Sequence, residues 1–255
     1  MTMTALSKPG PPRTPALPRD TAMRLAAVEY QRFGDALRLL RPDDWAKPTE
    51  CPGWDVRAMA AHALGMVEMA ASIRENNRQI KLAVSRGGVF IDALTALQVE
   101  ERADMTPAQI AARFAGRASK AARARRRAPG FIRRRVPPQL RQVEVGGRGE
   151  AWTLGYLIDI ILTRDPWMHR VDIARATGVD LVLTADHDGG LVADVVAEWA
   201  ARHGRPYTLH LTGPAGGTWR SGDGGQQIEA DAVEFCRLLS GRGHADGLRG
   251  VQVPF

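Results

Sequence analysis

The sequence predicts an α+β protein, with a long helical bundle followed by a small domain of helices and strands. Apolar residues recur at three- and four-residue spacing over most of the chain up to about residue 183. Beyond that point, period-two alternation in 207–212 and glycine-dense turns indicate strands. A chain of 255 residues also exceeds the usual size of one domain. We therefore expect a disordered tail over 1–19, a helical bundle over 20–183 and a small α+β domain over 184–255.

The N-terminal tail is predicted from its composition. Residues 1–19 contain five prolines and few large apolar side chains, so burial cannot offset the entropy lost on ordering. A first helix is predicted from Asp20, a suitable N-cap, to the residues before Pro42. Its apolar face repeats at helical spacing and comprises Ala26, Tyr30, Phe33, Leu37 and Leu40.

A second helix is predicted from Trp54 or Asp55 to about Arg78, after the turn-like segment PTECPG. Its apolar stripe comprises Val56, Met59, Ala63, Met66, Val67, Ala70 and Ile73. At 100° per residue, His62 lies roughly 70° from the centre of this stripe. The side chain of His62 should therefore point toward the bundle interior or its rim.

Further helices are predicted from their end signals. Thr106 is a suitable N-cap before Pro107 at the first helical position, and Gly178 is a suitable left-handed terminator. The remaining predicted helices cover 90–101, 106–128, 152–176, 185–202 and 231–239. Several helices joined by modest loops favour an antiparallel bundle for the first domain.

The overall composition is that of a soluble globular protein, with 44% hydrophobic and 25% charged residues. The sequence has no long uncharged apolar stretch and no charged start followed by an apolar run. Cys51 and Cys236 fall in different predicted domains, so we expect no disulfide between them. These features predict a cytoplasmic protein that does not span a membrane.

The net charge of +7 is concentrated in one segment. Between Arg117 and Arg141 there are ten cations and no acid, and without them the net charge would be −3. This arginine block could bind nucleic acid or another anionic surface, in which case binding would depend steeply on salt. It could also be a solvated helix face and loop, which we favour.

The spacing of Asp165 and His169 predicts a metal site. Residues four apart on a helix share one face, with Cβ atoms about 5–6 Å apart. Together with His62 from another helix, they would supply three ligands and leave a position open, as in catalytic zinc sites. Alternatively, Asp165 could be only an N-cap before Pro166, which fits poorly inside a helix. His62 could equally be a hydrogen-bonded core histidine, and His169 could pair only with Asp165 or Asp172.

Two segments, CPGWDVRAMAAHALG and TRDPWMHRVDIARATG, resemble in order and separation the signature segments of the mycothiol-dependent maleylpyruvate isomerase family. The resemblance implies a DinB-like four-helix bundle followed by a small sterol-carrier-like domain, with which the pattern GPAGGTWRSG agrees. It also implies a divalent metal, usually zinc, bound by His62, Asp165 and His169. The family is better known with glutamate at the acidic position, and Asp165 is one methylene shorter.

The resemblance implies a thiol-dependent reaction on a small acidic substrate. Mycothiol or a similar small thiol would add to a cis double bond and leave from the trans product. Arg220 is our candidate catalytic residue, as a clamp for a substrate carboxylate, although it could be an ordinary turn residue. A member that keeps the fold without catalysis remains an alternative, and the oligomeric state is open.

The residues around the predicted ligands are assigned supporting roles. Asp172 could orient His169, because a ligating histidine usually donates its other N–H to an oxygen. Arg57 and Arg170 flank the ligands and are either supporting residues or exposed. Cys51 is expected to be a buried structural thiol, since no basic partner is near it in sequence.

Overall fold

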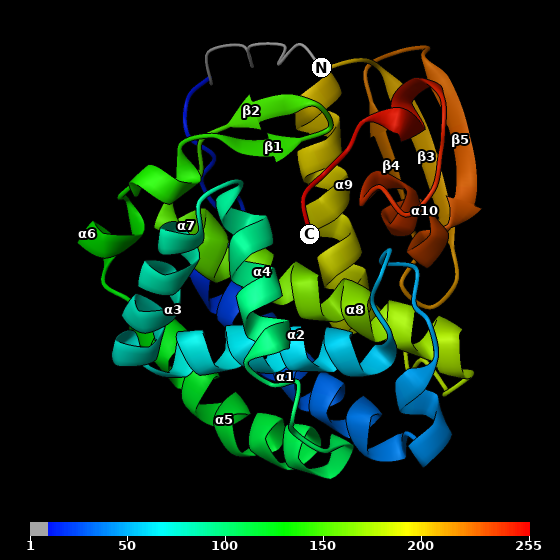
Figure 1. Ribbon diagram of the computed structural model, residues 1–255. Coiled ribbons are helices and arrows are strands. Elements are labelled where there is room, and N and C mark those ends of the chain that lie inside the picture. Colours follow the sequence, from blue (N-terminus) through cyan, green and yellow to red (C-terminus); the bar gives the residue numbers. More distant parts are fainter. Residues whose placement is uncertain (1–9) are drawn as a thin grey trace, which may run out of the picture.

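The computed structural model describes residues 10–255, and its core is a bundle of four helices. These helices are α1 (Arg19–Leu39), α2 (Val56–Ala71), α5 (Pro107–Arg127) and α8 (Leu162–Thr177). The helices α3 (Ile73–Arg86) and α4 (Phe90–Glu100) form an added pair that packs on α2 (Figure 1). Together with the sheet described below, this arrangement confirms the predicted α+β class.

The helix predicted over 55–78 is in fact two helices. Asp55 caps α2, and its Oδ1 accepts the N–H of Ala58 at 2.7 Å. The chain then turns at Ser72, which has extended backbone angles, and the Ser72 hydroxyl accepts the N–H of Glu75 at 3.3 Å. The prediction of one continuous helix is wrong because Ser72 and Glu75 start a new helix with a serine cap.

The last helix of the bundle contains two irregularities. A short helix α7 (Leu154–Tyr156) and a π-helical turn, Leu157–Ile161, precede α8. Pro166 lies inside α8 and has no N–H to donate to the carbonyl of Leu162, which instead accepts Nη1 of Arg125 at 2.9 Å. Asp165 is therefore an interior residue of α8, and the alternative that it is only an N-cap is wrong.

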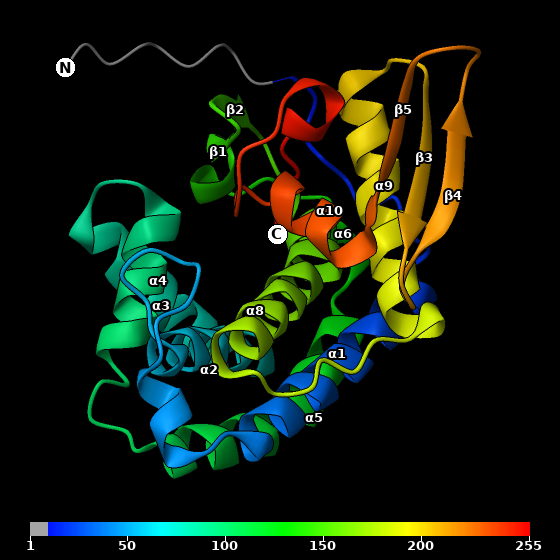
Figure 2. The ribbon, with the colours of Figure 1, turned by 90° about the vertical axis from the view of Figure 1, so that its right-hand side faces the viewer.

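The C-terminal part contains a three-stranded sheet and two helices. Strand β3 (Tyr207–Thr212) lies between β4 (Gly217–Ser221) and β5 (Gln226–Asp231), antiparallel to β4 and parallel to β5. This sheet lies beside α9 (Gly190–His203) and α10 (Ala232–Leu239), across the molecule from α3 and α4 (Figure 2).

The C-terminal part shares its core with the bundle. Buried side chains of α1 and α8 join those of the sheet, α9 and α10 in one cluster, which includes Leu25, Trp167, Met168, Val171, Val195, Trp199, Leu209 and Phe235. The domain boundary between residues 183 and 184 stays a prediction, and the parts on its two sides share this hydrophobic cluster.

The predicted tail is ordered where the structure describes it, and residues 1–9 lie outside the described residues. Arg13 donates its N–H to the carbonyl of Ala151 at 2.7 Å, and its guanidinium pairs with Glu150 at 3.0 Å. Glu150 ends a hairpin of β1 (Val143–Val145) and β2 (Arg148–Glu150) that the sequence analysis did not predict. Disorder is thus the wrong prediction for residues 10–18, because docking on this hairpin offsets the cost of ordering them. Helix α1 also begins one residue before Asp20, which does not act as the cap.

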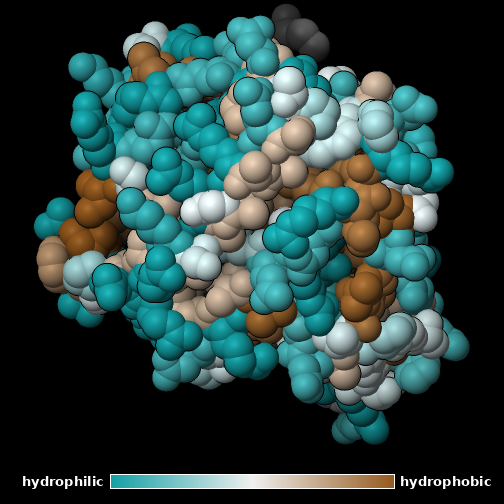
Figure 3. Space-filling model, turned by 90° about the horizontal axis from the view of Figure 1, so that it is seen from below, coloured by the Kyte–Doolittle hydropathy of each residue, from teal (hydrophilic) through white to brown (hydrophobic). Residues whose placement is uncertain are grey.

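The arginine block is divided between interior and surface. Arg125 is buried and donates to the carbonyl of Ile158 at 2.8 Å, while Arg133 of the short helix α6 (Gly130–Arg133) pairs with the buried Asp159. The interpretation as a solvated face is therefore wrong for these two residues. The other cations of α5 are exposed, and the face of the molecule that carries α1 and α5 is mainly hydrophilic (Figure 3). Binding of nucleic acid by this face stays a prediction.

Within residues 10–255, no single helix is long and apolar enough to cross a membrane. The pair α3 and α4, bent at 115°, passes the same test of length and composition only when taken together.

Candidate metal centre

The structure brings the three predicted ligands to one point between α2 and α8. Nε2 of His62 and Nε2 of His169 each lie 3.4 Å from Oδ1 of Asp165. One ligand atom from each side chain lies within 4.8 Å of the other two, which is the spacing that one cation could bridge. Both histidines are buried: the exposed fraction is 3% for His62 and 7% for His169. We call this group the candidate metal centre.

The remaining nitrogen of each imidazole faces an oxygen. Nδ1 of His62 lies 2.8 Å from Oε1 of Gln98, and Nδ1 of His169 lies 3.2 Å from Oδ2 of Asp172. This is the usual arrangement of metal-binding histidines, in which the second N–H is held by an oxygen and Nε2 faces the metal. The role predicted for Asp172 agrees with this contact. Gln98 was not among the predicted site residues.

Asp165 has an oxygen without a protein partner. Its Oδ2 is buried and has no hydrogen-bond partner among residues 10–255. A buried carboxylate oxygen with no donor is costly unless a cation or a bound molecule satisfies it. Two imidazole nitrogens and one carboxylate are also a donor set that suits zinc. The residues present therefore fit a divalent metal.

The charges of the centre are strongly coupled. Burial alone would raise the pKa of Asp165, but the nearby imidazoles of His169 and His62 outweigh it and lower the pKa. Burial alone would lower the pKa of His169, but the carboxylate of Asp165 raises it well above its usual value. The carboxylate thus remains ionised and favours positive charge at the point where the three side chains meet.

Arg242 is a neighbour of the centre that the sequence analysis missed. Its Nε and Nη2 each lie 2.7 Å from an oxygen of Asp172, and its Nη2 lies 3.5 Å from Nδ1 of His169. Cys51, His169 and Asp172 also satisfy the spacing for a metal, but here the guanidinium already supplies the positive charge. Sequence spacing gave no signal for Arg242, because 70 residues separate it from Asp172.

The wall of the centre is aromatic. The ring of Trp54, predicted to be a core residue, lies 5.1 Å from the ring of His62 and 6.0 Å from that of His169. Trp54 also lines a hollow of about 410 Å³, together with Arg57 and Arg102, although none of the three ligands lines it. Arg57 donates to the carbonyl of Met105 at 2.8 Å and so ties α2 to the segment before α5. Cys51 is half-buried and carries a free thiol.

Arg220, the predicted carboxylate clamp, is not brought to the centre. It lies on β4, where Nη2 pairs with Asp223 at 2.8 Å and Nε donates to the carbonyl of Gly222 at 3.3 Å. Its side chain is 64% exposed, and none of its contacts within residues 10–255 involves the three ligands. Arg220 is therefore a strand residue that pairs with the turn after β4, and its role as a clamp stays a prediction.

A second buried group of ionisable side chains includes Arg170, which directly follows His169 on α8. Glu29, His187 and Asp188 also satisfy the spacing for a metal. Arg170 pairs with Glu29 at 2.9 Å and with Asp188 at 2.9 Å, while Arg32 pairs with Asp188 at 2.5 Å. We call these five residues the ion-pair cluster. Arg170 therefore belongs to this cluster and does not support the candidate metal centre directly.

A family model described as the mycothiol maleylpyruvate isomerase N-terminal domain matches residues 26–174. This match covers more than half of the chain. The chain belongs to the mycothiol maleylpyruvate isomerase family. The matched segment contains His62, Asp165 and His169, whereas Arg220 and Arg242 lie beyond it.

The relatives and solved structures that are similar to this chain are distant in sequence. Two uncharacterized proteins of Mycobacterium tuberculosis, one from each of two strains, are 25% identical over 221 residues. The alignment covers 80% of this chain and 78% of each relative. A crystal structure of a mycothiol-dependent maleylpyruvate isomerase matches with a TM-score of 0.56 at 16% identity, over 89% of this chain and 90% of that one. A histidine-to-alanine mutant of that isomerase matches over the same shares with a TM-score of 0.54 at 15% identity. These two structures share the fold of this family member.

Proposed function

We propose that this protein is a cytoplasmic, metal-dependent enzyme that uses a small thiol such as mycothiol to isomerise a small acidic substrate or to transfer the thiol to it. The observation that carries the proposal is the meeting of His62, Asp165 and His169 at one point, where Oδ2 of Asp165 is buried and has no donor among residues 10–255. Membership of the mycothiol maleylpyruvate isomerase family supports the choice of thiol and of reaction.

The three ligands would hold a divalent metal, and zinc suits two imidazoles and a carboxylate. When bound, zinc would stabilise an added thiol as its thiolate at neutral pH, which supplies the nucleophile that this chemistry needs. The protein itself orients the two imidazoles through Gln98 and Asp172. Trp54 lies over both rings and limits the access of water to them.

An acidic substrate needs positive charge near the centre. The hollow beside Trp54 is lined by Arg57 and Arg102, and Arg242 lies on the opposite imidazole, 3.5 Å from Nδ1 of His169. Arg102 pairs with Glu68 and Arg242 with Asp172, so Arg57 is the one of the three with no carboxylate partner among residues 10–255. Its charge supports an anionic substrate over a neutral one.

The test compares His62→Ala with His210→Ala, a change at an exposed histidine of β3 that serves as the matched control. We expect elemental analysis to find stoichiometric zinc in the wild type and in His210→Ala, and none in His62→Ala. Added chelator should lower the melting temperature of the wild type, and zinc should restore it.

Activity is then measured as cis–trans isomerisation of maleylpyruvate with and without mycothiol. We expect turnover only when both metal and thiol are present. Absence of metal from the wild type after incubation with zinc would refute the proposal. Metal binding without turnover would instead support the non-catalytic member considered in the sequence analysis.

A further inference from the structure

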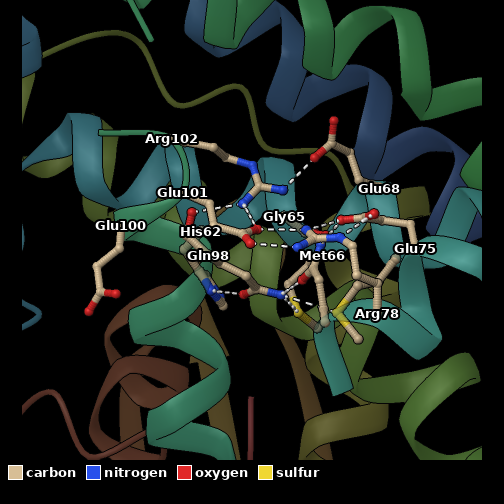
Figure 4. A network of polar contacts seen from close by, with 12 residues as sticks. His62, Gly65, Met66, Glu68, Glu75, Arg78, Gln98, Glu100, Glu101 and Arg102 are labelled. Carbon is tan, nitrogen blue, oxygen red and sulfur yellow. Dashed lines mark hydrogen bonds and ion pairs between the residues drawn. The ribbon is translucent and has the colours of Figure 1, made fainter. Parts of the chain in front are cut away.

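A series of hydrogen bonds between buried amide side chains connects the candidate metal centre to the added helices α3 and α4 (Figure 4). Oε1 of Gln98 lies 2.8 Å from Nδ1 of His62, and Nε2 of Gln98 lies 2.9 Å from Oε1 of Gln79. Nε2 of Gln79 in turn donates to Oε1 of Glu75 at 2.8 Å. Gln79 and Gln98 are fully buried, so water does not compete for these hydrogen bonds.

The donors and acceptors in this series of hydrogen bonds can be arranged in only one way. Nε2 of Gln79 faces Glu75 and the carbonyl of Gly65, at 2.8 and 3.3 Å, and both groups only accept hydrogen bonds. The carbonyl of Gln79 must therefore face Gln98 and accept from its amide nitrogen. The carbonyl of Gln98 is then left to face His62, and a flip of either amide would set two acceptors against each other.

The last acceptor in this series is the carboxylate of Glu75, which pairs with the guanidinium of Arg78. Arg78 donates to Glu75 at 2.6 and 2.9 Å, and its other side pairs with Glu101 at 2.6 Å. This pairing lowers the pKa of Glu75 to about 2, so the carboxylate stays ionised at neutral pH. Glu75 therefore accepts hydrogen bonds without donating any.

Gly65 leaves the space that Gln98 needs. A Cβ at this position would lie 2.5 Å from Cγ and 2.8 Å from Cβ of Gln98, which is closer than such atoms approach. Glycine is unfavourable inside a helix such as α2. Its position one turn after His62 is explained by the close approach of Gln98 to the helix.

We propose that Glu75, Gln79 and Gln98 form a directional relay that holds the proton of neutral His62 on Nδ1, 2.8 Å from Gln98, in preference to Nε2, which lies 3.4 Å from Oδ1 of Asp165. The relay rests on the proposed function for its purpose, because a bare Nε2 is what a metal requires. These three are positioning residues, since each acts on the centre through His62. The relay also gives the added pair α3 and α4 a role, because Gln79 lies on α3 and Gln98 on α4.

The first test reads the tautomer of His62 directly, in metal-free protein, by long-range ¹H–¹⁵N correlation spectra at a pH where the imidazole is neutral. We expect the Nδ1–H form in the wild type. Gln98→Met, which removes the acceptor, should shift the population to the Nε2–H form. Gln79→Met leaves Gln98 free to flip and should give a mixture. Met69→Leu is the matched control, because Sδ of Met69 touches Nε2 of Gln98 at 3.2 Å without belonging to the relay.

The second test measures zinc affinity by competition with a chelating dye. We expect Gln98→Met to weaken binding by about 10- to 100-fold, as is usual for the partner of a ligating histidine. Gln79→Met should weaken it less, and Met69→Leu should leave it unchanged. Gln98→Glu keeps an acceptor for Nδ1 but sets its second oxygen against Oε1 of Gln79, so we expect an affinity between that of Gln98→Met and that of the wild type. If Gln98→Met fails to fold, Gln79→Met still tests the relay with Gln98 in place.

The two proposals can fail separately. An unchanged Nδ1–H population in both Gln98→Met and Gln79→Met would overturn the relay even if the wild type binds zinc tightly. A wild type that binds no metal would overturn the proposed function, while the tautomer measurement would still decide the relay.

Discussion

Helix α8 contributes to two buried polar groups that are similar in composition. The candidate metal centre contains one carboxylate and two imidazoles, and the ion-pair cluster contains Glu29, His187 and Asp188 together with two arginines. Both groups bring three possible ligands within 4.8 Å of one another. Geometry alone therefore does not distinguish a metal site from a structural ion pair.

The difference lies in what the carboxylates bind. Both oxygens of Asp188 accept hydrogen bonds, one from Trp167 at 3.0 Å and the other from the N–H of Thr184 at 2.7 Å. Both oxygens of Glu29 accept from Arg170. Asp165 has no arginine partner within residues 10–255, and its Oδ2 accepts nothing there. A cluster whose arginines already balance its carboxylates has no need of a metal, whereas Asp165 does.

The largest expected effect is on stability, from Glu29→Gln in the ion-pair cluster. This change leaves the buried guanidinium of Arg170 with less compensating charge and should lower the free energy of unfolding by about 3–5 kcal/mol. Zinc content per folded molecule should not change. Denaturant unfolding and elemental analysis measure the two effects. Asp35→Asn, in an exposed pair with Arg38, is the control and should cost no more than about 1 kcal/mol.

A loss of zinc from folded Glu29→Gln would contradict the comparison, because it would mean that the two groups act as one. So would a loss of stability no greater than that of Asp35→Asn, since the cluster would then not be structural.

Metal removal should have the next largest effect on stability, and it should act on the candidate metal centre. With zinc at 100 to 1,000 times its dissociation constant, binding to the folded state adds about 3–4 kcal/mol of stability, which chelation removes. The size of this loss should be the same in the wild type and in Glu29→Gln, because the two groups share no ligand. Unfolding of both proteins with and without chelator measures it. Unequal losses would show that the two sites are coupled.

Low pH should weaken the ion-pair cluster by protonating Asp188. Burial alone would raise the pKa of Asp188, but Arg170 and the N–H of Thr184 outweigh it and lower the pKa below its usual value of 3.8. Asp188 also faces Arg32, and ligand atoms of Glu29 and His187 lie within 4.8 Å of its carboxylate. The unfolded state therefore binds a proton to this carboxylate more readily, so its stabilising contribution is full above about pH 4 and is lost as the pH falls through the lowered pKa.

The measurement is the difference in unfolding free energy between metal-free wild type and Asp188→Asn. We expect this difference to be constant from neutral pH down to about pH 4 and to shrink below it. Metal-free protein is used so that release of zinc does not contribute. A difference that grew as the pH fell would contradict the assignment of Asp188 as an ionised partner of Arg170.

Much of the fold could be predicted because helix ends are encoded locally. Thr106 and Pro107 start α5 and Gly178 ends α8 through the residues that the sequence analysis named, since a cap acts within one turn. The approach of His62 to Asp165 and His169 followed from helical periodicity and from the resemblance to the family. A helix face can be read from the order of its own residues.

Other features depend on contacts between distant segments, which one sequence does not reveal. Arg125 completes the helix around Pro166, yet nothing near either residue in sequence indicates the other. Gln98 and Arg242 reach the candidate metal centre in the same way, from a different helix and from the C-terminal part. The signal that could have pointed to Gln98 was Gly65, because a glycine inside a helix indicates close packing of a neighbour.

The smallest expected effects come from changes at Arg242 and Arg220. Arg242→Gln removes the guanidinium from Asp172 and so loosens the orientation of His169, for which we expect a loss of zinc affinity of about tenfold. Arg220→Gln is the matched change at an exposed arginine and should alter stability by less than about 0.5 kcal/mol, with no change in zinc affinity. Chelator competition and unfolding measure both.

The same pair of variants also tests the carboxylate clamp predicted for Arg220. A clamp that binds substrate and transition state equally would raise KM in Arg220→Gln and leave kcat unchanged. Since Arg220 pairs with Asp223 away from the three ligands, we expect neither constant to change. An increase in KM for the acidic substrate confined to Arg220→Gln would show that β4 reaches the substrate. In that outcome, KM would be unchanged in Arg242→Gln, so the guanidinium of Arg242 would serve to hold Asp172 and not to bind substrate. Arg170 has the same role when it pairs with Glu29 and Asp188.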